Sequence, residues 1–146
     1  MRKGSVLAVT PLMIAPVMIY NLFALTLPGG LKSPVAHANL AQPLLRLTTT
    51  GGGAWPVSAG DLLLAAALCV LFVELVKSTA SRRLAMINHA LSALLFAVCL
   101  SEMLLAPACA TSTFFLVTLM VLLDVLASFM ARTGANRRAT ELSDIR

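Results

Sequence analysis

The feature that most constrains this chain is a series of three apolar runs in its second half. The runs cover residues 60–77, 84–105 and 113–131. A basic turn with Arg82 and Arg83 joins the first two runs, and an uncharged turn around Pro107 joins the last two. Because a helix rises about 1.5 Å per residue, each run is about long enough to cross the roughly 30 Å of hydrocarbon in a bilayer. The series predicts three closely spaced transmembrane helices.

The overall composition also points to a membrane protein. Of the 146 residues, 59% are hydrophobic and only 12% are charged. Soluble domains are about half apolar and about a quarter charged, so this chain has too little polar surface to cover a globule in water. The bilayer is the natural solvent for such a chain. At this length we expect a single transmembrane domain over residues 1–132, followed by a basic tail over residues 133–146.

A fourth apolar run, over residues 6–27, precedes the series and is long enough for another span. Pro11 and Pro16 interrupt it, so a kink is expected near them. The residues before Ala38 fit the small-x-small cleavage pattern of a signal peptide. The apolar run is longer than a typical signal-peptide core, and ten residues separate it from Ala38. A retained helix is favoured, which gives an all-α, four-helix transmembrane bundle, and cleavage after Ala38 stays the alternative.

The segment over residues 28–59 is the one long polar stretch between the spans. It is rich in proline and glycine, and residues 44–49 partly alternate and contain many β-formers. Three consecutive glycines then provide a flexible reversal before Trp55. The segment is either an irregular loop or a β-hairpin. Two strands alone are marginally stable in water, so a hairpin is expected to lie on the bundle or on lipid headgroups, with Trp55 as an interface anchor.

The distribution of basic residues predicts the orientation of the four spans. With both ends of the chain on one side, that side holds nine of the eleven Lys and Arg residues: Arg2, Lys3, Lys77, Arg82, Arg83, Arg132, Arg137, Arg138 and Arg146. The other side holds Lys32 and Arg46. By the positive-inside rule both termini are cytoplasmic, and the tail is expected to be mobile. Six of these residues are expected to contact anionic lipid headgroups: Lys77, Arg82, Arg83, Arg132, Arg137 and Arg138.

Five polar residues within the spans form a candidate intramembrane cluster: Glu74, Asn88, His89, Asp124 and Ser128. A carboxylate in hydrocarbon costs several kcal/mol unless it is paired, neutral or near the interface. Glu74 lies about 4 Å from the level of Lys77 and can pair with it. His89 lies about 9 Å beyond the basic turn and Asp124 about 12 Å inside the basic residues that follow the last span, so the two can meet. Asn88 and Ser128 are further hydrogen-bond partners.

This cluster has two interpretations if His89 and Asp124 meet, and the remaining alternative is that they do not meet. The first is a packing clasp that sets the register of the helices. The second is a protonatable pair of the kind that proton-linked transport or pH sensing would use. Glu102 lies about 28 Å beyond the basic turn and is expected to be a solvated helix end. A stripe of small residues on the third span would allow close approach of another helix. Its members are Ala90, Ala93, Ala97 and Ser101.

The sequence lacks the motifs of the main enzyme classes. It has no phosphate-binding glycine loop before a helix, no HExxH and no GxSxG. The three cysteines, Cys69, Cys99 and Cys109, have neither disulfide-framework nor zinc-ligand spacing. We therefore expect no catalytic residues, no metal and no cofactor. The basic residues cluster outside the apolar runs, so we expect the partners to be the lipid bilayer and its anionic headgroups, and not a nucleic acid.

Four segments carry a resemblance to a known group of proteins. They are residues 60–64 (GDLLL), 72–77 (FVELVK), 87–92 (INHALS) and 118–125 (TLMVLLDV). In these segments the chain resembles a group of small, uncharacterised four-helix membrane proteins of alphaproteobacteria. The resemblance covers the first helix and residues 55–138. It implies a bacterial inner-membrane location and a four-span fold, and it implies no activity. With the orientation given above, residues 28–59 are then expected in the periplasm.

These observations favour a non-enzymatic integral inner-membrane protein. We expect an accessory or scaffold subunit, or a small homo-oligomer, that contacts other membrane proteins or copies of itself. The alternative is a proton- or ion-linked transport or pH-sensing component that uses the intramembrane polar cluster.

Overall fold

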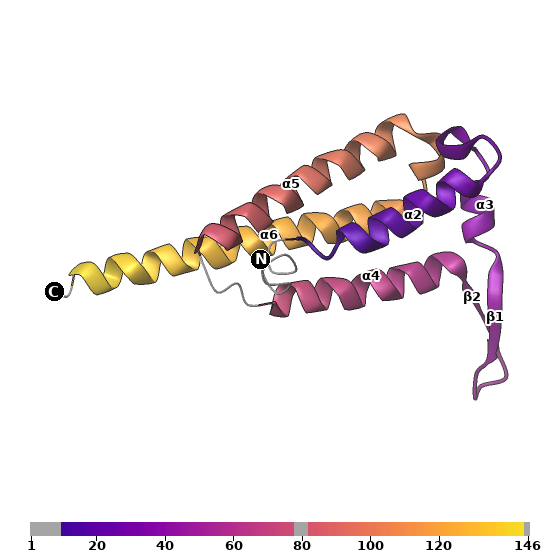
Figure 1. Ribbon diagram of the computed structural model, residues 1–146. Helices are drawn as coiled ribbons and strands as arrows, with labels where there is room; N and C mark the ends of the chain where they lie inside the picture. Colours follow the sequence, from indigo (N-terminus) through magenta and orange to yellow (C-terminus); the bar gives the residue numbers. More distant parts are fainter. Residues whose placement is uncertain (1–9, 78–81, 145–146) are drawn as a thin grey trace, which may run out of the picture.

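The computed structural model describes residues 10–77 and 82–144, and the side chains of residues 10–77 and 85–130. The described chain is mostly helical, with one small antiparallel sheet (Figure 1). In chain order the elements are α2 (Ile14–Thr26), η1 (Gly30–Lys32), α3 (Ala36–Leu40), β1 (Pro43–Thr48), β2 (Ala54–Ser58), α4 (Ala59–Val76), α5 (Arg82–Leu105), η2 (Pro107–Cys109) and α6 (Ser112–Asp144).

Among the described residues, three helices are long and apolar enough to cross a membrane. These are α4, residues 85–105 of α5 and residues 112–130 of α6. Most of their large apolar side chains point outward: Phe72 on α4 is 67% exposed and Leu104 on α5 is 73% exposed. Such faces are stable in hydrocarbon and not in water. The three closely spaced spans are confirmed at the level of length and composition, and the chain is a membrane protein.

The first helix differs from the expected span over residues 6–27. Helix α2 has 13 residues, which corresponds to about 20 Å, and residues 1–9 lie outside the described part of the chain. The helix begins after Pro11 and places Pro16 in its first turn. There a proline is tolerated, since the first backbone N–H groups of a helix have no partner within it. The described part of the chain therefore contains three spans and one shorter apolar helix.

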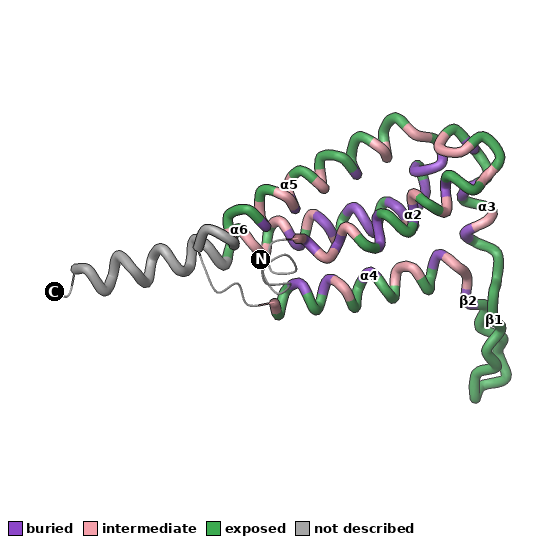
Figure 2. Tube along the Cα trace, in the orientation of Figure 1, coloured by how far each residue is buried: buried purple, intermediate pink, exposed green. Residues whose placement is uncertain are grey.

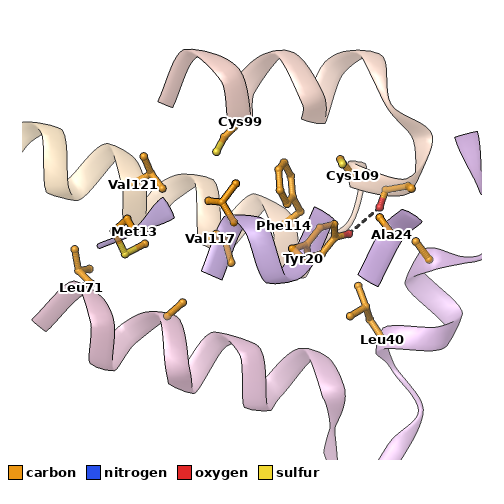
Figure 3. Close-up of a cluster of buried hydrophobic side chains, with 14 residues drawn as sticks. Met13, Tyr20, Ala24, Leu40, Leu71, Cys99, Cys109, Phe114, Val117 and Val121 are labelled. Carbon is orange, nitrogen blue, oxygen red and sulfur yellow. Dashed lines mark hydrogen bonds between the residues drawn. The ribbon is translucent and has the colours of Figure 1, made fainter. Parts of the chain in front are cut away.

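Helix α6 lies along the middle of the bundle, with α4 and α5 on either side of it (Figure 1). Helix α2 packs against α4 and α6. The buried core follows this central line (Figure 3), where the rings of Tyr20 and Phe114 lie 4.6 Å apart between centroids. Val117 and Val121 continue the core along α6 towards Met13 and Leu71. Because the core is narrow, the outward faces of the helices are left to lipid.

The segment between the first two helices forms a β-hairpin, which is one of the two structures expected from its sequence. Strands β1 and β2 pair antiparallel, with Leu45 opposite Val57 and Leu47 opposite Trp55. Gly52 has a φ of 78° in the reversal, which is a conformation that favours glycine. Nearly every hairpin residue is exposed, and the hairpin projects beyond α4 (Figure 2). It does not lie on the bundle, which corrects one of the two placements expected for it.

Short helices that the sequence analysis did not predict complete this end of the molecule. Helix α3 buries Ala36 and Leu40, and it packs against α4 and η2. Helix α4 then begins with a capping box, in which Ser58 and Asp61 exchange hydrogen bonds between side chain and backbone. A capping box satisfies N–H groups at the start of a helix. The hairpin therefore ends where the first described span begins.

The last helix extends beyond its expected end. Helix α6 continues to Asp144, whereas the sequence analysis ended the fourth span at residue 131 and expected a mobile tail over residues 133–146. A helix that already exists extends without a new nucleation step. The region from 132 to 144 has three arginines and two alanines and contains no proline. The chain after the span is therefore helical rather than irregular as far as residue 144.

Gly60 provides a test of how closely α3, α4 and α6 approach one another. A Cβ atom at this position would lie 2.8 Å from Thr113 Oγ1 and 3.4 Å from the Leu40 carbonyl oxygen. We expect Gly60→Ala to lower the free energy of unfolding by about 1–3 kcal/mol, because overpacking strains its neighbours. The measurement is unfolding in mixed detergent micelles, followed by circular dichroism.

Two further variants make this prediction specific. Gly51→Ala is the matched control, because a Cβ at Gly51 would have no neighbour within 4 Å, and its stability should stay near that of the original chain. Adding Thr113→Ala to Gly60→Ala should restore part of the loss. A Gly60→Ala variant that is as stable as Gly51→Ala would contradict the close approach.

Candidate functional site

The most densely bonded polar group is the Glu74 carboxylate, near the end of α4. Its side chain is only 2% exposed and forms a salt bridge with Lys77, at 3.0 Å from Nζ to Oε1. The Leu12 N–H donates to Oε2 at 2.9 Å. The Lys77 ammonium also donates to the Thr10 carbonyl at 2.9 Å. The expected Glu74–Lys77 pair is present, and it fastens the chain at the start of α2 to the end of α4.

The position of α2 explains these contacts. Backbone N–H groups at and before the first turn of a helix have no partner within it, and they carry a partial positive charge. A carboxylate is the acceptor that best satisfies such donors. Leu12 immediately follows Pro11, which has no N–H of its own. Glu74 therefore completes the hydrogen bonding of a helix start that would otherwise be exposed to hydrocarbon.

Glu74 also reaches the next span. Asn88 on α5 donates from Nδ2 to Glu74 Oε1 at 3.1 Å, and Asn88 is itself only 7% exposed. One turn further along α5, Ser92 donates from Oγ to Asp124 Oδ2 on α6 at 2.7 Å. Both Ser92 and Asp124 are buried. Two carboxylates thus connect the start of α2 to α4, α4 to α5, and α5 to α6.

The partner of Asp124 corrects the sequence prediction of an Asp124–His89 pair. Among the described residues Asp124 bonds to Ser92, and Ser128 makes no hydrogen bond to it. Counting helical rise from Arg83 places Ser92 at about 14 Å and His89 at about 9 Å, against about 12 Å for Asp124. Depth alone does not separate these two partners. The rotation of α5 about its axis selects Ser92, and this rotation depends on packing.

Two buried polar atoms beside these carboxylates lack a hydrogen-bond partner among the described residues. They are His89 Nδ1 and Asn88 Oδ1. The His89 ring lies 6.5 Å from the ring of Phe129, measured between centroids. The structure thus joins Glu74 to Asn88 and Asp124 to Ser92, with Ser92 in the place expected for Ser128.

The other end of α2 is held by uncharged donors. The Tyr20 hydroxyl donates to the Ala108 carbonyl at 2.7 Å and lies 2.6 Å from Thr111 Oγ1. Figure 3 shows this bond beside the core. Asn21 Nδ2 donates to both oxygens of Glu102, at 2.9 and 3.0 Å. Glu102 was expected to be a solvated helix end, and this is corrected: it binds α2 to α5.

Cys109 lies within the same end of the bundle. Its side chain is fully buried, and its thiol lies 3.8 Å from Asn21 Oδ1. Burial, reinforced by the nearby Glu102 carboxylate, raises the pKa of the Cys109 thiol to about 11. The thiolate is the reactive form of cysteine, so this thiol is unreactive near neutral pH. All three cysteines are free, and Cys109 serves as a packing residue.

Only one of the six residues expected at lipid headgroups has a described side chain. Lys77 turns inward to Glu74 and the Thr10 carbonyl, and its side chain is 16% exposed. A headgroup contact is therefore not its main interaction. The side chains of Arg82, Arg83, Arg132, Arg137 and Arg138 lie outside the described part of the structure.

The described residues offer little for catalysis or metal binding. Within them, no three His, Cys, Asp or Glu side chains are grouped so as to hold a metal ion. A shallow open groove of about 510 Å³ lies between η1 and the last turns of α5, with Lys32 and Glu102 among its lining residues. Ala97 and Ser101 line it, and both are exposed. The small-residue stripe therefore faces outward, and the bundle does not use these two positions for its own packing.

Comparison with known proteins gives no match. No family model fits the chain, and no curated protein and no solved structure matches it. The resemblance to small membrane proteins of alphaproteobacteria stays a prediction.

The Glu74 network predicts a large cost for removing one carboxylate. Glu74→Gln would present an amide N–H₂ to surrounding donors and leave the Lys77 charge without its partner. Because breaking a buried pair in this way is strongly destabilising, we expect the free energy of unfolding to fall by about 2–3 kcal/mol. Unfolding in mixed micelles measures the loss.

Glu102→Gln is the matched control, since it makes the same chemical change in another span. Its carboxylate accepts from the Asn21 amide, and a glutamine oxygen can keep that bond. We expect a loss below about 1 kcal/mol. Equal losses in the two variants would show that the Glu74 network has no special role.

Proposed function

We propose that this chain is a non-enzymatic integral protein of a bacterial inner membrane, and that it acts as an accessory or scaffold subunit. The observation that carries the proposal is the bonding of the two carboxylates, Glu74 and Asp124. Glu74 is surrounded by donors from α2, α4 and α5, and Asp124 is bonded to Ser92. Acids that are hydrogen-bonded to neighbouring helices in this way keep those helices in register, which is the role of interhelical hydrogen bonds in membranes. Assembly is then left to the outer faces.

The outer face of α5 supports the assembly part of this proposal. Ala90, Ala97 and Ser101 are exposed, and Ala93 is half-buried, on a helix that otherwise carries large apolar side chains outward. Small side chains let the backbones of two transmembrane helices approach closely. This face therefore suits contact with a helix of another membrane protein or of a second copy.

The proposed orientation has both termini in the cytoplasm. The start of α2 and the end of α4 meet at the Glu74–Lys77 pair, so they share one end of the bundle. Lys32 lies on η1, which packs against η2 at the opposite end, and Arg46 lies on the hairpin. The excess of basic residues at the Lys77 end supports a cytoplasmic location for that end, with anionic headgroups around it.

A second candidate is a proton- or ion-linked transport or pH-sensing component. The observation that favours it is a pair of buried atoms that have no hydrogen-bond partner among the described residues: His89 Nδ1, and Asn88 Oδ1 on the side chain that bonds to Glu74. A buried polar atom that lacks a partner often marks a site that binds a proton, a water molecule or an ion during function. In this reading the same residues would form part of a path across the membrane.

Recovery from native membranes tests the accessory role. The full chain, tagged at its C-terminus and mildly solubilised, should run as a stable complex that sizing and mass spectrometry resolve. Ala97→Leu should reduce the recovered complex, because the larger side chain blocks close approach at the stripe. Ala66→Leu is the matched control, since Ala66 is exposed on α4 away from the stripe, and it should leave the complex intact. A lone monomer, or equal effects of the two variants, would contradict this assembly.

Proton flux into vesicles tests the second candidate separately. On the accessory reading, vesicles that contain the full chain should take up protons no faster than empty vesicles. Asp124→Asn and His89→Gln should then change stability alone. A pH-dependent flux that both variants abolish, with the helical circular dichroism signal retained, would overturn the accessory reading in favour of transport. Glu102→Gln controls for general loss of charge.

A further inference from the structure

The β1–β2 hairpin has one apolar and one more polar face. Side chains of directly opposed residues in a sheet point to the same face. Leu45 is opposite Val57, and Leu47 is opposite Trp55, so these four side chains form a continuous apolar face. Arg46 is opposite Pro56 on the other face. Two-stranded hairpins are marginal in water, so an apolar face of this kind requires a cover.

Most of the apolar face is exposed. Leu45, Leu47 and Trp55 are 54%, 48% and 58% exposed, whereas Val57 is 8% exposed where β2 meets α4. Strand β2 runs directly into the capping box of α4, which is the first described membrane span. The base of the hairpin is therefore at the level where α4 enters the membrane. Whatever covers the apolar face lies at that level.

The direction in which the hairpin runs agrees with a position at the membrane surface. Figure 1 shows that β1 and β2 run across the direction of the transmembrane helices, outward past α4. A hairpin in this direction lies along the membrane surface rather than away from it. Val57 belongs to the apolar face and is buried at the base of the hairpin. At its base the apolar face is therefore turned towards the bundle.

We propose that the hairpin rests on the bilayer surface with Leu45, Leu47 and Trp55 inserted among the lipid headgroups and upper acyl chains. The partner is the phospholipid leaflet in which α4 begins. Trp55 is suited to this level, because its ring is apolar and its indole N–H can bond to water or headgroups. Arg46 on the opposite face stays in the water.

The edges of the hairpin favour lipid over another protein strand. Pro56 in β2 and Pro43 in β1 have no N–H groups to donate to an added strand. The pairing also has an irregularity between Pro43 and Leu45, and irregularities of this kind block edge-to-edge pairing. Strand addition by a partner or a second copy is therefore disfavoured, and the apolar face is left to the bilayer.

The single tryptophan of the chain makes a direct test available. The full chain is placed in phosphatidylcholine–phosphatidylglycerol vesicles, and Trp55 fluorescence is recorded with acrylamide or with lipids brominated at shallow or deep acyl positions. We expect blue-shifted emission, strong loss of intensity with shallow-brominated lipids, and weak quenching by acrylamide. Trp55→Phe combined with Arg46→Trp moves the reporter to the opposite face, where acrylamide should quench more and brominated lipids less.

Two results would overturn the proposal. Red-shifted Trp55 emission that acrylamide quenches and brominated lipids do not would place the face in water. Blue-shifted emission that neither quencher affects would place a protein partner over it, most directly a second copy, and sizing would identify that copy. A loss of lipid quenching in the Leu45→Ser, Leu47→Ser double variant, with α-helical circular dichroism retained, would support insertion through this face.

Discussion

The structure depends on the cost of a carboxylate in a medium of low dielectric constant. An ionised group there needs a counter-charge or several hydrogen-bond donors. Glu74 obtains both, from Lys77, the Leu12 N–H and the Asn88 amide. Because these donors belong to three different segments, satisfying one charge fixes the start of α2, the end of α4 and the first part of α5 together. The apolar core then packs between segments whose positions this charge has fixed.

The same logic operates with uncharged donors at the opposite end. Tyr20 bonds to the Ala108 carbonyl, and Asn21 bonds to Glu102, so α2 is fastened at both ends although its outward residues are apolar. Short helices that surround this end bury Ala108 and Cys109. Hydrogen bonds in low dielectric are stronger than in water, and unmade ones cost more. A 13-residue helix is thereby held firmly in the bundle.

What could be predicted from the sequence follows from these interactions. The three spans are long apolar runs, and the Glu74–Lys77 pair joins neighbours on one helix face, so both were predicted. Contacts between helices were predicted poorly, because residue counting gives the depth of a side chain but not the direction in which it points. Ser92 rather than His89 meets Asp124 for this reason. The Asn21–Glu102 contact was missed because a polar residue placed near the membrane interface can be solvated by water. Its depth alone therefore gives no reason to expect a protein partner.

The distribution of polar groups with and without hydrogen-bond partners also indicates which surfaces can bind partners. Among the described residues both interior acids, Glu74 and Asp124, are bonded, whereas His89 Nδ1 and Asn88 Oδ1 have no hydrogen-bond partner. The exposed small residues of α5 and most of the apolar face of the hairpin, by contrast, have no cover among the described residues. Apolar surface is stable when removed from water, so these faces are the ones that lipid or other helices must occupy. An interior fixed by internal bonds, combined with uncovered outer faces, is the arrangement on which the proposed accessory role rests.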